Sequence, residues 1–162
     1  MSNLYVLCGA PGSGKSTFAK EIFPHYFPDR PYKIISRDEI RFSLLKDGEE
    51  YFSHENEVYQ ILWDSINQAL KEGFDVISDQ TSLNPNSRTF LLQHISGYEE
   101  AIAIEIKTPL EMCLDRNNQR VGKTFVPPDR VKNMYYSYKS PTISEGFSYV
   151  YTYDSLREVL FI

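Results

Sequence analysis

The stretch that decides the fold lies near the N-terminus: the apolar run Leu4-Tyr-Val-Leu-Cys8, followed at once by Gly9-Ala-Pro-Gly-Ser-Gly-Lys-Ser16. A short apolar run that ends at glycine predicts a buried strand leading into a turn. The pattern Gly-x-x-x-x-Gly-Lys-Ser predicts a phosphate-binding loop, provided that a strand precedes it and a helix follows it. The first half of that condition is met by the apolar run.

The second half is met by a helix expected to start near Lys15. Its apolar face is supplied by side chains at helical spacing: Phe18, Ala19, Ile22 and Phe23. We expect Pro24 to end this helix, because proline lacks the N–H that a helix interior needs. The two flanks together favour a phosphate-binding loop over a chance glycine turn.

The rest of the chain alternates between strand and helix patterns. Further strands are expected at 33–36, 74–78, 101–106 and 149–153, and helices after residue 36, over 54–71, after Asn84, after Pro109 and after Pro127. Near-continuous apolar strands that alternate with helices predict a parallel sheet covered on both faces. The expected fold is a three-layer α/β P-loop kinase domain with a mostly parallel sheet of about five strands, and a helical lid at about 116–126.

Composition is ordinary for one globular domain spanning 1–162, with 41% hydrophobic and 24% charged residues. No apolar run has the length of a membrane span and no signal peptide is visible, so we expect a cytoplasmic protein without a membrane partner. Cys8 and Cys113 lie far apart, which makes a zinc site improbable. The net charge of -5 argues against broad coating of nucleic acid but leaves room for a local basic cleft.

The loop is expected to bind ATP with Mg²⁺. Its glycines permit a tight turn, and its backbone N–H groups and the helix N-terminus face the phosphates. Lys15 should bridge the β- and γ-phosphates and Ser16 should bind Mg²⁺, while Thr17 should contact the α-phosphate or cap the turn. The nucleotide-binding set is Gly9, Ala10, Pro11, Gly12, Ser13, Gly14, Lys15, Ser16 and Thr17. An Asn-Lys-x-Asp guanine signature is absent from the sequence, which disfavours a GTP switch, and the size favours a kinase.

The acceptor side is expected at Arg37-Asp38-x-x-Arg41, directly after the second strand. The carboxyl ends of strands in such sheets face the ligand crevice. Asp38 could act as the general base for an acceptor hydroxyl, and Arg41 could bind a phosphate on the acceptor. The alternative is a helix cap at Asp38 paired with Arg41 on the surface. Asp79, at the end of the third strand, could order magnesium through water or orient Arg41.

A basic segment follows in Arg116-Asn-Asn-Gln-Arg120, which then runs into a glycine. Arg116 and Arg120 are four residues apart, and so share one helix face. We expect this segment to close as a lid and to bring an arginine to the transferred phosphoryl group. The alternative is a solvated helix end whose arginines favour the C-terminal dipole.

Four blocks together resemble the kinase domain of bacteriophage-type polynucleotide 5'-hydroxyl kinases. They are Gly9 to Thr17, Ser36-Arg-Asp-Glu-Ile-Arg41, Val76 to Pro85 with Arg88, and Arg116-Asn-x-x-Arg120 followed by Val126-Pro127. The blocks occur in the family's order and span about four-fifths of the chain. The lid block holds an extra residue before Val-Pro, and a phosphatase motif Asp-x-Asp-x-Thr is absent from the sequence.

The resemblance implies a catalytic set and a substrate-binding set. The catalytic residues would be Lys15 at ATP, Asp38 as general base and Arg120 at the transferred phosphate, with Arg116 beside Arg120. The resemblance also implies Arg41 on the acceptor's 3'-phosphate, Asp79 at the acceptor site and Ser16 at magnesium. Together with the roles argued from the strand ends, the expected substrate-binding residues are Arg37, Asp38, Arg41, Asp79 and Arg88, and the expected metal-binding residues are Ser16 and Asp79.

The expected function is therefore transfer of the ATP γ-phosphate to the 5'-hydroxyl of DNA or RNA, or of a nucleoside 3'-phosphate. The acidic net charge suggests a short footprint on that partner, and no protein partner is expected. One alternative is a kinase of a small hydroxyl compound such as a nucleoside, sugar or antibiotic. Another is a nucleotide-binding regulator that transfers no phosphate.

Overall fold

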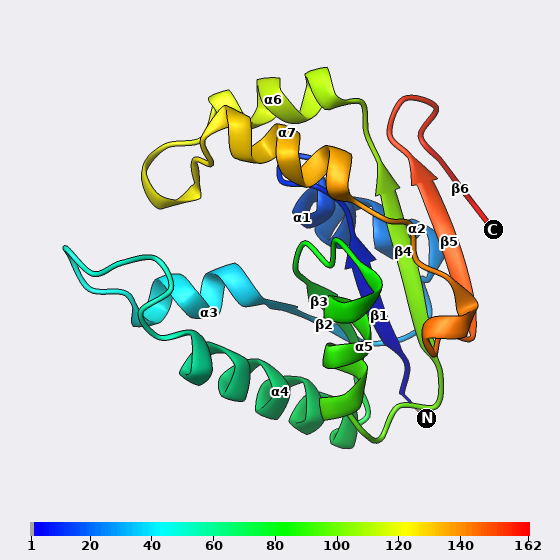
Figure 1. The fold of residues 1–162 in the computed structure, drawn as a ribbon. Helices are drawn as coiled ribbons and strands as arrows, with labels where there is room; N and C mark the ends of the chain where they lie inside the picture. The colour runs from blue at the N-terminus through cyan, green and yellow to red at the C-terminus, as the bar shows by residue number, and fades with distance from the viewer. Residues whose placement is uncertain (1) are drawn as a thin grey trace.

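The protein has one six-stranded sheet between two layers of helices, as the computed structural model of residues 2–162 shows (Figure 1). The strand order is β2, β3, β1, β4, β5, β6, and only the β5–β6 pair is antiparallel. The strands are β1 (Leu4–Cys8), β2 (Tyr32–Ser36), β3 (Asp75–Asp79), β4 (Ala101–Lys107), β5 (Tyr149–Asp154) and β6 (Val159–Phe161). The expected three-layer α/β fold with a mostly parallel sheet is confirmed.

Helices connect the strands and cover both faces of the sheet. They are α1 (Lys15–Thr17), the π-helix η1 (Phe18–Ile22), α2 (Phe23–Tyr26), α3 (Arg37–Leu44), α4 (Glu55–Lys71), α5 (Pro85–His94), α6 (Leu110–Asn118), the 3₁₀ helix η2 (Gly122–Thr124), α7 (Pro128–Ser137) and the 3₁₀ helix η3 (Ile143–Glu145). Among residues 2–162, none of these helices is long and apolar enough to cross a membrane.

Two apolar clusters hold the layers together, one on each face. One face of β1, carrying Leu4 and Val6, packs against α4 residues such as Leu62 and Ile66. The opposite face of the sheet packs against the helix that follows the phosphate-binding loop, and includes Phe18 and Phe23. β1 is buried along its whole length, so the loop at its carboxyl end follows directly from the core of the protein.

The helix after the loop does not end at Pro24, contrary to expectation. It continues from Lys15 through the π-helical turn η1 into α2, which ends at Tyr26. Pro24 lies in the first turn of α2, directly after the π-helical turn. At such a position the missing N–H of proline costs little, because first-turn N–H groups have no regular helical partner.

A sixth strand was not predicted from the sequence. β6 pairs antiparallel with β5, through Thr152 opposite Phe161 and Asp154 opposite Val159. It is only three residues long and alternates between exposed and partly buried positions. Its three residues are all apolar, but so short a run does not by itself predict a strand, and its conformation depends on its neighbour across the turn.

The strand register brings two predicted site segments together. Asp79, at the end of β3, lies opposite Ser36 of β2 and opposite Leu7 of β1. Ser36 caps α3, because its side chain accepts a hydrogen bond from the Glu39 N–H. The carboxyl ends of β1, β2 and β3 therefore present the phosphate-binding loop, the start of α3 and Asp79 along one edge of the sheet.

Candidate active site

The phosphate-binding loop is held in a tight turn by the elements around it. The carbonyl oxygen of Ser13 accepts hydrogen bonds from Thr108 Oγ1 at 2.7 Å and Arg116 Nη1 at 2.9 Å. Gly12 has a φ of +80°, and an added Cβ there would stand 2.4 Å from the Cys113 carbonyl oxygen. Glycine is required at this position by both the backbone conformation and the close approach of α6.

Lys15 begins the helix after the loop, and its ammonium reaches back over the loop. Its Nζ donates to the carbonyl oxygens of Gly9 and Ala10, each at 3.1 Å. Gly14, before it, has no side chain that could cap the helix, so the N-terminus is left open for an anion. The Lys15 ammonium, held by two carbonyl oxygens, and the free helix N-terminus together form a cradle. This cradle fits the phosphates of a nucleoside triphosphate.

Other predicted residues lie around the same ammonium. Burial lowers the pKa of Lys15, while the negative charge of Asp79 works to raise it. Arg120 lowers the pKa of Lys15 by repulsion, and Asp38 raises it by attraction. Groups from β3, α3 and the segment after α6 thus act electrostatically on Lys15. This agrees with the strand register, which brings the phosphate-binding loop, the start of α3 and Asp79 to one edge of the sheet.

Ser16 and Asp79 meet as the sequence pattern suggested for a magnesium site. Ser16 Oγ donates to Asp79 Oδ2 at 2.8 Å. A hydroxyl and a carboxylate beside a phosphate cradle are the hard oxygen groups that Mg²⁺ accepts. Of the two roles left open for Asp79, the geometry favours magnesium, because Arg41 makes its contacts with other residues. Thr17 makes no side-chain cap hydrogen bond.

Asp38 presents its carboxylate to solvent while two neighbours hold it in place. Its side chain is 63% exposed. Asp38 Oδ1 accepts hydrogen bonds from Arg41 Nη1 at 2.6 Å and from the Tyr51 hydroxyl at 3.3 Å. Arg41 Nη1 also donates to the Tyr51 hydroxyl at 2.9 Å, which closes a triangle of three side chains. A carboxylate that is fixed but accessible can take a proton from an acceptor hydroxyl.

Arg41 is buried, and most of its donors are already used. Its side chain is 4% exposed. Besides Asp38 and Tyr51, it donates from Nε and Nη2 to the two carboxylate oxygens of Glu55, at 3.1 and 2.5 Å. These contacts take four of the five N–H groups of the guanidinium. A phosphate that bound Arg41 through two N–H groups would have to replace one of these partners, and in this structure Arg41 positions Asp38.

Glu55 is a central residue of this cluster that the sequence did not reveal. It also accepts from Arg37 Nη2 at 2.5 Å, and Arg37 in turn contacts the Tyr59 hydroxyl at 2.7 Å. Burial works to raise the pKa of Glu55, but hydrogen bonds from Arg41 and Arg37 outweigh it, and the pKa lies below its ordinary value. The only signal in the sequence was an acidic residue at the start of an amphipathic helix, which is typical of a helix N-terminus.

The predicted lid is a loop that follows α6 and is fastened at its base. The Asn117 side chain donates to the Val126 carbonyl oxygen at 2.6 Å and accepts from the Val126 N–H at 3.0 Å. Between these residues Arg120 is exposed, and its Nη1 meets only the Thr124 carbonyl oxygen, at 3.5 Å. Arg116 is bound to the phosphate-binding loop, so the two arginines have different surroundings. In Figure 1 this loop and the one before α4 project from the same side of the molecule.

Arg88 is buried inside the fold, whereas we expected it to contact the substrate. It is fully buried, and donates to both carboxylate oxygens of Glu145, at 2.5 and 3.3 Å, and to the Ser82 carbonyl oxygen at 2.7 Å. The Ser140 carbonyl oxygen is a weaker partner at 3.4 Å. Arg88 therefore has no surface with which to contact a substrate in this structure, and it ties α5 to η3.

The chain also has recognisable relatives. Residues 4–141 match the protein family described as AAA domain. The chain is 32% identical over 143 residues to the L-seryl-tRNA(Sec) kinase of Methanococcus maripaludis, covering 85% of this chain and 53% of that protein. It is 26% identical over 146 residues to an Autographa californica nuclear polyhedrosis virus protein named for bifunctional polynucleotide kinase/RNA ligase, covering 82% of this chain and 20% of that protein.

A solved structure has a similar fold. A chain of the Pnkp1/Rnl/Hen1 RNA repair complex superposes with a TM-score of 0.69 at 26% identity, over 84% of this chain and 43% of that one. The family resemblance drawn from the four sequence blocks is confirmed by these matches. The chain spans about half the length of the seryl-tRNA kinase and a fifth of the viral protein.

Proposed function

Because the chain belongs to the AAA-domain family, with a match that includes the whole phosphate-binding loop, we propose that it is an ATP-dependent phosphotransferase. It transfers the γ-phosphate to the 5'-hydroxyl of DNA or RNA, or of a nucleoside 3'-phosphate. The observation that carries this proposal is the accessible carboxylate of Asp38, held by Arg41 and Tyr51 beside the cradle around Lys15. Nucleotide binding alone would not require such a carboxylate.

On the donor side, the loop N–H groups and Lys15 bind and orient the triphosphate, with Lys15 at the β- and γ-phosphates. Ser16 and Asp79 would hold Mg²⁺, which when bound neutralises charge on the phosphate oxygens. Arg116 keeps the loop in shape through Ser13, and Arg120 approaches the transferred phosphoryl group when the lid loop closes. In this account Arg120 is the mobile cation and Arg116 supports the loop.

On the acceptor side, Asp38 accepts the proton of the attacking hydroxyl as the new O–P bond forms. The bond between the γ-phosphorus and the oxygen that bridges it to the β-phosphate breaks, and ADP is the leaving group. The Lys15 cradle holds the β-phosphate of ADP as this bond breaks. Arg41 and Tyr51 keep the Asp38 carboxylate oriented, and Glu55 keeps Arg41 in place. The relatives support a nucleic-acid acceptor, because they are named for a seryl-tRNA, a polynucleotide or RNA repair.

One observation favours a second candidate, transfer to a hydroxyl that has no neighbouring phosphate. Glu55, Asp38 and Tyr51 take four of the five N–H groups of Arg41, so the acceptor side offers no free pair of N–H groups to bind a phosphate. A small hydroxyl compound, or a hydroxyl remote from any phosphate, would not need Arg41 to change partners. The two candidates share the donor side and the base, and differ in what Arg41 does.

The replacement Asp38→Asn tests the proposal. It preserves shape and leaves the loop untouched, so ATP affinity measured by calorimetry should stay within about twofold, while kcat should fall by about 10²–10⁴-fold with loss of the base. The matched control is Glu39→Gln, a neighbouring carboxylate whose side chain takes no part in the cluster. Unchanged transfer by Asp38→Asn would remove Asp38 from the role of base.

A further inference from the structure

An exposed aromatic ring lies next to the candidate base. Phe52 belongs to the loop of residues 45–54 between α3 and α4, and 59% of it is exposed. A single exposed aromatic residue is ordinary on a protein surface and needs no explanation by itself. The position of Phe52 does need an explanation, because Phe52 contacts the residues that hold Asp38.

Phe52 is positioned by the same side chains that position Asp38. Its ring contacts Tyr51 edge to face, with centroids 4.8 Å apart. The Arg41 guanidinium lies 5.4 Å from the centroid of the Phe52 ring and 4.5 Å from that of Tyr51. Since Tyr51 also bonds Asp38, one aromatic pair links an exposed ring to the proposed base.

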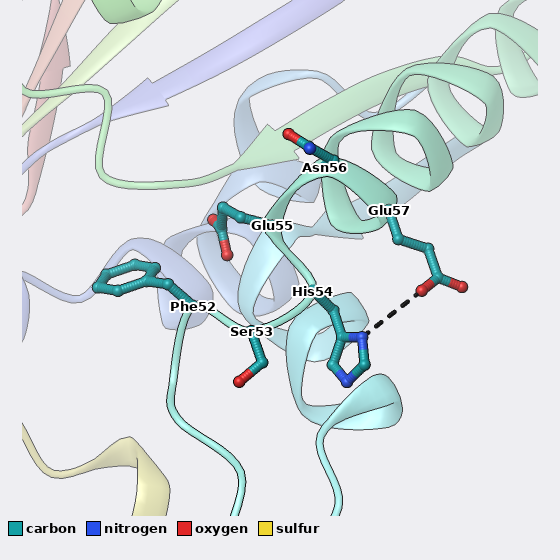
Figure 2. Close-up of a pocket in the computed structure, with 6 residues that line it drawn as sticks. All are labelled: Phe52, Ser53, His54, Glu55, Asn56 and Glu57. Atoms are coloured by element: carbon teal, nitrogen blue, oxygen red, sulfur yellow. Dashed lines mark ion pairs between the residues drawn. The ribbon is translucent and has the colours of Figure 1, made fainter.

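A surface hollow of about 430 Å³ opens beside this ring and is lined by residues 52–57. Figure 2 shows the Phe52 ring extending to one side of the chain while the His54 ring turns toward Glu57 on the other. His54 Nδ1 is 3.7 Å from Glu57 Oε2, and its Nε2 is 2.8 Å from Glu49 Oε2. The His54 imidazole is therefore occupied by two carboxylates, and Phe52 is the exposed apolar ring that lines the hollow.

The charge around this loop selects the part of an acceptor that can bind there. Three acidic residues of the loop, Asp47, Glu49 and Glu50, precede Phe52, and all three are exposed. A phosphate placed beside these carboxylates would be repelled. A neutral nucleobase would not be repelled, and any base presents a flat face to an aromatic side chain.

We propose that Phe52 stacks on the nucleobase of the acceptor nucleotide that carries the 5'-hydroxyl, and so positions that hydroxyl at Asp38. This inference rests on the proposed function and adds a specificity-determining residue to it. The sugar of a nucleotide joins its base to its 5'-hydroxyl, so a base held at Phe52 leaves the hydroxyl within reach of the neighbouring carboxylate. Any base satisfies this contact, which makes Phe52 tolerant of sequence.

The test compares two 5'-hydroxyl oligonucleotides that differ only in whether the first nucleotide has its base or is abasic. Phe52→Ala should raise KM about 10-fold for the intact acceptor, as expected for the loss of one base–aromatic stack, and change it less than about twofold for the abasic one. Phe52→Trp should keep the low KM. The matched control is Tyr149→Ala, which removes a 43% exposed aromatic ring at the first residue of β5, the end of the sheet opposite the phosphate-binding loop.

Four outcomes would count against the inference. An equal change of KM for both acceptors would show that Phe52 does not contact the base, and so would an effect that follows removal of the second base instead of the first. Transfer by the wild-type chain to both acceptors, with no effect of Phe52→Ala, would overturn this inference and leave the proposed function standing. Transfer by the wild-type chain to neither oligonucleotide, nor to a nucleoside 3'-phosphate, would overturn both.

Discussion

At the scale of single residues, the candidate site is a chain of contacts that ends on one carboxylate. Glu55 holds Arg41, and Arg41 together with Tyr51 holds Asp38. Only the last of these carboxylates is widely exposed, since the Asp38 side chain is 63% exposed and that of Glu55 is 21% exposed. The Asp38 carboxylate can therefore contact an acceptor, whereas the Glu55 carboxylate has a structural role.

The role of Arg41 can be measured by comparing two acceptors on one variant. Arg41→Ala should raise KM for a nucleoside 3'-phosphate by at least about 10-fold, the loss of a charge-assisted contact, if Arg41 changes partners to bind the phosphate. KM for the corresponding nucleoside should change much less. Because both acceptors are measured on the same protein, any general loss of folded enzyme affects both. Equal effects would favour the second candidate function.

Residues that the sequence revealed share one feature, a position at a strand end or in the loop motif. Lys15 and Ser16 follow from the motif, and Asp38 and Asp79 from the rule that parallel strands end at the ligand. Glu55 could not be found in this way, because its partners lie 14 and 18 residues away and only the tertiary fold brings them together. The burial of Arg88 could not be predicted either, because only the tertiary fold brings Arg88 and Glu145 together.

At the scale of secondary-structure elements, α4 contributes to the site through its first residue. Glu55 has a pKa below its ordinary value, so the folded state binds this proton less readily than the unfolded state does. Its contribution to stability is complete above the unfolded pKa of about 4.3 and is lost as the pH falls through the folded pKa.

Glu55→Gln is therefore expected to lower the free energy of unfolding at pH 7 by about 1–3 kcal/mol and to weaken its dependence on pH below about 4.5. Urea unfolding at pH 7 and at pH 4 measures both effects. The neighbouring Glu57→Gln, at an exposed carboxylate, serves as control and should cost less than about 1 kcal/mol. The same pH dependence in wild type and Glu55→Gln would contradict the assignment.

A buried ion pair between Arg88 and Glu145 joins α5 to η3, and we expect it to contribute to the stability of the fold. Arg88→Met should destabilise the fold by about 3–5 kcal/mol, because it leaves the Glu145 carboxylate buried without its partner. Thermal unfolding measures this, and Arg157→Met, which removes an arginine that is 79% exposed, should cost less than about 1 kcal/mol. If Arg88 served the substrate instead, its replacement would raise KM and leave the stability unchanged.

Elements with strong periodicity were predicted well, and those that depend on neighbours were not. The amphipathic pattern before Lys71 corresponds to α4, which buries Val58, Leu62 and Ile66. The π-helical turn η1 carried no pattern that distinguishes it from an α-helix, so the effect of Pro24 was misjudged. β6 is stabilised by pairing with β5 and has too few residues to show a period of two.

At the scale of the whole molecule, the sheet order explains why distant sequence blocks form one site. β1 lies between β3 and β4, so the loop after β1 has Asp79 on one side and the start of α6 on the other. The motif and its flanks were sufficient to predict this architecture, because each parallel strand requires a crossover helix. The net charge of -5 remains compatible with an acceptor that is gripped near one end.

The central claim is tested most directly by following the γ-phosphate of labelled ATP in the presence of Mg²⁺. The acceptors are 5'-hydroxyl DNA, 5'-hydroxyl RNA, nucleoside 3'-phosphates and unphosphorylated nucleosides. Our account predicts label at the 5' end of at least one kind of strand or of the nucleoside 3'-phosphates, and loss of that label in Asp38→Asn. Release of labelled phosphate to water with no label on any acceptor strand or nucleoside 3'-phosphate would contradict it.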